Sequence, residues 1–177
     1  MSPLRQMTVW VAIVTLTTGA GIVSATNRNG CYKFADAVIN WYNGGTGSYF
    51  TIYEEEAKTD ANAWHPYTDV SLTSVAAAGT TDHINAYNGF YGATGWLSLS
   101  EIRTVSGCTI QNGRLRMNQT YLDSGSYTLT QKKAMACNLI GRILGLTNQS
   151  GTAGCMDGTL NNPFPSPHDR DMINAIY

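Results

Sequence analysis

The apolar residues that follow Thr128 repeat with the period of an α-helix. At about 100° per residue, one side of this stretch gathers Ala136, Ile140, Ile143 and Leu144. The opposite side gathers Gln131, Met135, Asn138 and Arg142. Thr128 and Gln131 form a capping-box start, and Gly145 suits the left-handed residue after a helix C-terminus. We therefore predict a helix with one side packed in the core and the opposite, more polar side facing away from the core.

A second helical period runs from Ser48 to Trp64. Its apolar positions fall at i, i+3, i+7, i+11 and i+14, and are Phe50, Tyr53, Ala57, Ala61 and Trp64. We expect Pro66 to end this helix. The charged residues that lie largely off the apolar stripe, which we interpret as a solvated face, are Glu54, Glu55, Glu56 and Lys58.

Shorter runs rich in strand-forming residues predict a sheet, with strands over 37–42, 69–75, 82–87 and 113–121. A glycine-rich run from Asn88 to Ile102 contains Trp96 and precedes the last of these strands. The C-terminal segment predicts a final helix, with Ser166 as N-cap, Pro167 at its first position and Asp169 three residues after the cap. Its buried side is expected to be Met172, Ile173, Ile176 and Tyr177.

Residues 1–25 have the pattern of a secretory signal peptide. Arg5 supplies the positive charge, the apolar run 7–16 is too short to span a bilayer, and residues 23–25 are small at the expected cleavage site. An uncleaved anchor is the alternative, but no stop-transfer pattern follows. We predict a secreted, extracellular protein with one domain over 26–177 and no membrane attachment after cleavage.

Composition narrows the possible partners. Charged residues make up 13% of the chain and the net charge is -1, so nothing indicates a nucleic-acid or anionic-membrane partner. The four cysteines are Cys31, Cys108, Cys137 and Cys155, and an even number in an exported chain predicts two disulfides with three possible pairings. A zinc-thiolate cluster is the alternative, but the chain has no CxxC motif.

Residues 141–148, GRILGLTN, followed by Cys155-Met156-Asp157, carry a family resemblance. They are similar to the metzincin zinc peptidases, in particular the small secreted snapalysin-like and matrixin-like enzymes, whose helix reads HExGHxLGLxH or HExxHxxGLPD. The resemblance covers roughly 37–177. It implies an α+β, zincin-like fold: a twisted mixed sheet of about five strands, an N-terminal helix, a central active-site-type helix, a Met-turn and a C-terminal helix. Met156 and Gly145 match the family pattern, which implies structural roles for both residues.

The same alignment places the family's zinc chemistry on unsuitable residues. The first ligand histidine falls on Asn138, the catalytic glutamate on Leu139, the second histidine on Arg142 and the third ligand on Asn148. Neutral amides are poor zinc ligands, a guanidinium stays protonated, and leucine takes no proton. We therefore expect no catalytic residue, no metal and no cofactor, with zinc as cofactor only if another ligand set exists.

The resemblance also suggests roles for other residues. It favours Cys137–Cys155, which would tie the active-site helix to the Met-turn, and leaves Cys31–Cys108. It likens the run around Trp96 to the stretch leading into the edge strand of the substrate groove, whereas a loop with Trp96 as core plug is the alternative. Arg142 either fills the metal position, bonded to Asn138, Asn148 or Asp157, or recognises an acidic group of a ligand.

Two sequons and three histidines complete the candidates. Asn118 and Asn148 each begin an N-glycosylation triplet. The histidines that we interpret as structural or surface residues, not ligands, are His65, His83 and His168. These observations predict a monomeric, secreted pseudopeptidase that binds a protein or peptide as a decoy, inhibitor or effector-like factor. An active secreted zinc endopeptidase and an extracellular structural glycoprotein are the alternatives.

Overall fold

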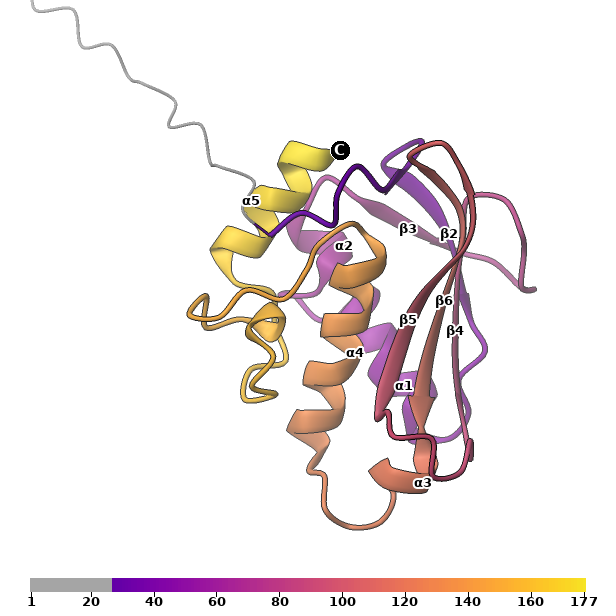
Figure 1. Ribbon diagram of the computed structural model, residues 1–177, viewed down its shortest axis with the longest axis vertical. Coiled ribbons are helices and arrows are strands. Elements are labelled where there is room, and N and C mark those ends of the chain that lie inside the picture. The colour runs from indigo at the N-terminus through magenta and orange to yellow at the C-terminus, as the bar shows by residue number, and fades with distance from the viewer. Residues whose placement is uncertain (1–26) are drawn as a thin grey trace, which may run out of the picture.

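The computed structural model describes residues 27–177 as one α+β domain built on a six-stranded sheet (Figure 1). The strands are β1 Lys33–Phe34, β2 Val38–Asn43, β3 Ser71–Ser74, β4 His83–Gly89, β5 Ser98–Ser106 and β6 Thr109–Asn118. The path β6-β4-β2-β3 is parallel throughout, and the two-residue β1 pairs in parallel with the start of β6. Only β5 runs antiparallel, along the other side of β6. The predicted signal peptide lies outside the described residues.

The predicted strands over 37–42, 69–75 and 82–87 are confirmed as β2, β3 and β4. The last predicted strand, 113–121, begins earlier, at Thr109, and ends at Asn118. There the chain turns into the short helix α3, Gln119–Leu122, because the Asn118 side chain caps it by accepting a hydrogen bond from the Thr120 backbone N–H.

The helix predicted over 48–64 is three pieces: α1 Ser48–Glu54, the π-helix η1 Glu55–Thr59 and α2 Trp64–Tyr67. The chain is extended at Asp60, so the helix breaks there and not at Pro66, which lies inside α2. The buried face keeps α-helical spacing but begins one residue earlier than predicted, and it consists of Tyr49, Ile52, Tyr53, Glu56 and Ala57. Phe50 and Ala61, predicted to be in the core, are exposed, whereas Glu56, predicted to be solvated, is completely buried.

Helix α4, Leu129–Ile143, has the predicted capping box, and so has α5, Pro167–Ile176. Helices α1, α2, α4 and α5 lie on the same side of the sheet (Figure 1). The predicted apolar side of α4 is buried, and Met135, predicted on the opposite side, is buried as well. No helix among residues 27–177 is long and apolar enough to cross a membrane.

Two disulfides are present, with the pairing that the resemblance implied. Cys31–Cys108 joins the segment before β1 to the β5–β6 turn. Cys137–Cys155 joins α4 to the 3-10 turn η2, Cys155–Asp157. The cysteines therefore do not form the alternative zinc-thiolate cluster.

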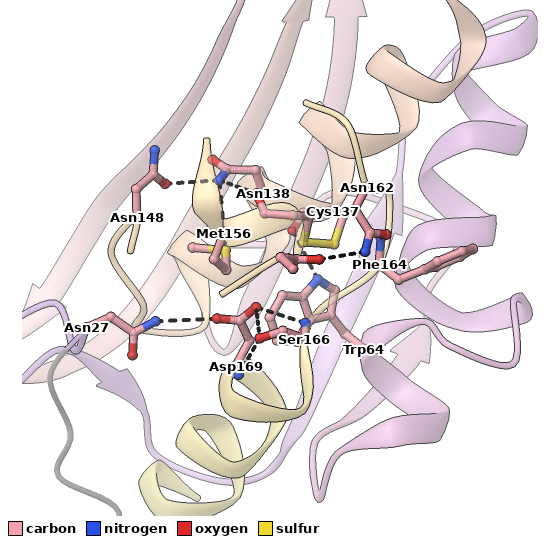
Figure 2. Close-up of a disulfide and its surroundings, with 12 residues drawn as sticks. Asn27, Trp64, Cys137, Asn138, Asn148, Met156, Asn162, Phe164, Ser166 and Asp169 are labelled. Atoms are coloured by element: carbon pink, nitrogen blue, oxygen red, sulfur yellow. Dashed lines mark hydrogen bonds between the residues drawn. A yellow bond between two sulfur atoms is a disulfide. The ribbon is translucent and has the colours of Figure 1, made fainter. Parts of the chain in front are cut away.

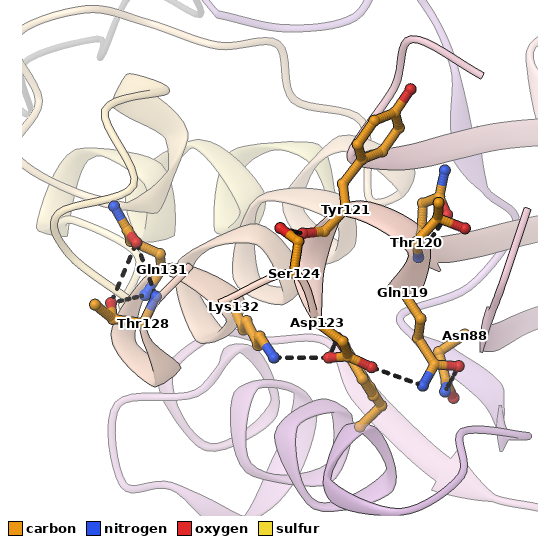
Figure 3. A network of polar contacts seen from close by, with 11 residues as sticks. Asn88, Gln119, Thr120, Tyr121, Asp123, Ser124, Thr128, Gln131 and Lys132 are labelled. Carbon is orange, nitrogen blue, oxygen red and sulfur yellow. Dashed lines mark hydrogen bonds and ion pairs between the residues drawn. The ribbon is translucent and has the colours of Figure 1, made fainter. Parts of the chain in front are cut away.

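A polar network fixes the start of α4 (Figure 3). The Asp123 carboxylate accepts hydrogen bonds from Tyr49 Oη at 2.6 Å, Lys132 Nζ at 2.8 Å and Gln119 Nε2 at 3.1 Å. Burial raises the pKa of Asp123, but these hydrogen bonds and the Lys132 charge outweigh burial and hold it below its ordinary value. The ionised carboxylate thus links α1, α3 and α4.

Candidate functional site

The structure brings together three of the residues singled out in the sequence: Asn138, Asn148 and Met156 (Figure 2). The half-buried Asn138 amide on α4 donates to Asn148 Oδ1 at 2.9 Å and to the Cys155 carbonyl oxygen at 2.8 Å. The same nitrogen lies 3.9 Å from the Met156 sulfur. The first and third aligned ligand positions therefore face each other and are hydrogen-bonded.

Close packing under this pair explains why a glycine lies inside α4. A Cβ on Gly141 would come within 2.5 Å of the Met156 sulfur and 2.6 Å of the Trp64 ring. Trp64 is held in place because its Nε1 donates to the Cys137 carbonyl oxygen at 3.0 Å. At the end of the helix, Gly145 has a φ of 111°, which favours glycine, as the sequence predicted.

The other two aligned positions take no part in this contact. Leu139 is 2% exposed and packs in the core. Arg142 is exposed, and within residues 27–177 its side chain forms no hydrogen bond or ion pair. The interpretation that Arg142 fills the metal position and bonds to Asn138, Asn148 or Asp157 is therefore wrong, because the two asparagines satisfy each other.

The residues at this position do not fit a zinc ion. Asn138 turns its N–H groups, not its oxygen, toward Asn148 and Cys155, and a donor cannot coordinate a cation. Within residues 27–177, no group of three or more His, Cys, Asp or Glu side chains is placed to hold a metal ion. His65 Nδ1 accepts from the Leu72 backbone N–H, and His168 Nε2 lies 2.9 Å from Gln149 Oε1, both in local contacts.

Strand β5 is an edge strand, and in the described part of the chain it pairs only with β6. The Asn118 backbone N–H donates to Leu97 O, which sets the alternation of the antiparallel ladder. Leu99 and Glu101 therefore bond toward β6, and Ser100 directs its N–H and C=O toward the free edge. Helix α4 packs beside this strand, and a pocket at its far end is lined by Tyr32, Ile102, Arg103, Thr104 and Val105.

Trp96, a candidate binding residue, lies just before β5 and is half-buried. Its ring centroid is 5.1 Å from that of Tyr91, and the Arg116 guanidinium lies 5.2 Å from the Trp96 ring. Trp96 is absent from the hydrophobic core, so the core-plug interpretation is wrong.

The asparagines of the two sequons differ in their exposure to solvent. Asn118 is completely buried, and its side-chain nitrogen donates to Gly92 O, Thr94 Oγ1 and Trp96 O. A glycan on Asn118 is incompatible with this fold. Asn148 is exposed, and its glycosylation remains a prediction.

Sequence reasoning missed Glu56. Its side chain is completely buried in η1, and neither carboxylate oxygen has a hydrogen-bond partner among the described residues. Burial raises the pKa of Glu56 to about 8; the Lys133 charge lowers it, and Asp60 and Glu55 raise it further. A carboxyl group is thus kept neutral at neutral pH beneath α4. It lies there because it follows Tyr49, Ile52 and Tyr53 on the buried side at α-helical spacing.

No model of a known protein family matches the chain, and no curated protein is significantly similar to it. The site must therefore be judged from its own geometry.

Proposed function

We propose that this protein is a secreted, catalytically inactive relative of the metzincin zinc peptidases that binds an extended peptide segment along β5. The observation that supports the proposal most directly is the hydrogen bond between Asn138 and Asn148 beside the Met156 sulfur. On the proposed alignment, two amides stand at ligand positions and Leu139 at the position of the base, and none of these side chains can bind a zinc-activated water or take its proton.

The arrangement of elements agrees with this proposal. A mixed sheet with one antiparallel edge strand, a helix after the last strand, a turn at Met156 and a terminal helix follow one another as the resemblance implies. The two disulfides are compatible with an extracellular protein.

Binding without catalysis remains possible because the free edge of β5 needs no metal. An extended segment can add to a sheet edge through main-chain hydrogen bonds, and side-chain pockets then supply selectivity. The pocket around Tyr32 lies along the same strand. Arg142, exposed one helical turn beyond Asn138, is available to pair with an acidic group of the bound segment. Such a protein would act as a decoy, inhibitor or effector-like factor.

Replacing Ser100 with proline tests this role of β5. The Ser100→Pro variant loses a backbone N–H that faces the free edge, a place where a sheet tolerates proline. Loss of one hydrogen bond and the added ring predict about tenfold weaker binding to denatured casein. Binding is measured by surface plasmon resonance at about 0.3 M salt, which screens charge attraction.

Ser100→Ala is the matched control, because it removes the hydroxyl group and keeps the N–H. We expect it to bind casein like the wild type. Equal casein binding by wild type, Ser100→Pro and Ser100→Ala would contradict peptide addition to β5.

A further inference from the structure

We propose that the sheet face opposite the helices is a second binding surface, for an acidic segment of a partner protein. This surface, the arginine–aromatic face, consists of Tyr42, Tyr87, Tyr91, Trp96, Arg114 and Arg116, with Glu101 and Arg103 at its β5 side. It lies apart from the Asn138–Asn148 pair and does not depend on the function proposed for β5.

The strand register places these side chains on one face. Ile84, Ala86, Leu115 and Met117 are buried in the core beneath the helices. The alternate residues of β4 and β6 therefore point to the opposite face. Tyr87 is paired with Arg116 across the ladder, and its ring contacts Tyr42 of β2 at 5.9 Å between centroids.

Much of this face has no covering element within residues 27–177. The helices α1, α2, α4 and α5 lie on the other side of the sheet (Figure 1). The loop around Gly79 covers the other end of this sheet face, where the Gly79 carbonyl oxygen accepts a hydrogen bond from Asn85 Nδ2 at 3.0 Å. Tyr42, Tyr87, Tyr91 and Trp96 remain partly accessible.

The charges on this face are unbalanced. Glu101 is the single carboxylate paired with three arginines: Arg114 Nε is 2.8 Å away, Arg116 Nη2 3.0 Å and Arg103 Nη1 3.8 Å. Burial raises the pKa of Glu101, but the Arg114 hydrogen bond and the three positive charges outweigh burial and keep it ionised. Three cations against one anion leave a local excess of positive charge in a chain whose net charge is -1.

The positive groups are also held in position. The Arg116 guanidinium lies 5.3 Å from the centre of the Tyr91 ring and 5.2 Å from that of Trp96, within the range of cation–π attraction. A pre-ordered arginine loses less conformational freedom when it binds a ligand than a free one does.

The composition favours a protein as the occupant. Tyrosine, tryptophan and arginine are the residues enriched at the energetic centres of protein interfaces, and lysine is depleted there. Apart from Glu101, the residues that define the arginine–aromatic face are of these three types, and Leu99, paired with Arg116, adds an apolar side chain to the same face. Its excess positive charge selects a partner segment rich in aspartate and glutamate.

The test uses poly-L-glutamate as the acidic probe and measures its binding by fluorescence anisotropy at about 0.05 M salt. We expect the double variant Arg103→Gln/Arg114→Gln to bind at least about tenfold more weakly than wild type. Because Arg103 and Arg114 side chains are 49% and 30% exposed, the variant should keep its fold. The single variant Arg103→Glu, at the most exposed position, should also weaken binding.

The control Arg28→Gln/Lys58→Gln removes the same charge elsewhere and should bind like wild type. Ser100→Pro should also retain poly-L-glutamate binding, which separates this face from the free edge of β5. Equal weakening by the control pair would overturn the proposal, because net charge alone would then explain binding. Binding of heparin, a sulfated polysaccharide, without binding of poly-L-glutamate would overturn it as well.

Discussion

Replacing Glu56 with glutamine should stabilise the protein at neutral and alkaline pH. The Glu56 carboxyl group is buried without a hydrogen-bond partner among the described residues, and its pKa is raised from 4.5 to about 8. The folded state therefore retains a proton that the unfolded chain releases. Wild-type stability should fall as pH rises from about 4.5 to about 8 and change no further through this group above that.

The expected size follows from the shift. For each pH unit between 4.5 and about 8, the free energy of unfolding of the wild type falls by about 1.4 kcal/mol. Glutamine should therefore raise the free energy of unfolding, relative to wild type, by about 3 kcal/mol at pH 7 and up to about 5 kcal/mol at pH 9. Below pH 4.5 the two proteins should be equally stable, because a neutral carboxyl group and an amide have similar burial costs.

Urea unfolding of both proteins across this pH range measures the difference directly. Glu55→Gln is the matched control, because Glu55 is the neighbouring, more exposed carboxylate and pairs with Lys133 at 2.7 Å. This variant should change stability by less than about 1 kcal/mol. A pH-independent difference between wild type and Glu56→Gln would show that Glu56 is not buried as described.

Placing a methyl group on Gly141 should destabilise the fold at the candidate site. Alanine normally stabilises a helix by about 1 kcal/mol over glycine. Here the new Cβ would come within 2.5 Å of the Met156 sulfur and 2.6 Å of Trp64, far below contact distance. We expect Gly141→Ala to lower the free energy of unfolding by about 2 kcal/mol in spite of the better helix propensity.

A double-mutant cycle with Trp64→Phe assigns the cause. Phenylalanine lacks the outer ring atoms that the new methyl group would meet, so Gly141→Ala should cost less in the Trp64→Phe background than in wild type. Strict additivity of the two changes, or a stabilising Gly141→Ala, would show that α4 does not pack closely on Trp64.

Local signals in the sequence predicted several elements correctly. The capping boxes at Thr128 and Ser166 are present, because a cap depends on residues only three positions apart. The first helix was misplaced for the opposite reason. The predicted buried face began at Phe50, whereas the observed one begins at Tyr49 and includes Glu56, and only packing against the rest of the domain decides between these neighbouring faces. Glu56 was therefore placed in solvent.

The candidate site was predictable in part. Three residues that the alignment singled out, Asn138, Asn148 and Met156, lie near one another. The interpretation that Arg142 fills the metal position was wrong: its side chain is exposed, Asn138 bonds to Asn148, and the Asp157 carboxylate accepts from Thr159. Asn118 shows the limit of short motifs: its triplet reads as a sequon, but its side chain is buried against the 92–96 loop.

The zinc stoichiometry of the purified protein, measured by elemental analysis, tests the central claim most directly. A variant with histidine at all three aligned ligand positions, Asn138→His/Arg142→His/Asn148→His, is measured beside it, and denatured casein is incubated with both, with and without a chelator. We expect near-zero zinc and no chelator-sensitive cleavage for the wild type, and about one zinc per chain for the variant. About one zinc in the wild type with chelator-sensitive cleavage of casein would contradict the proposed loss of catalysis.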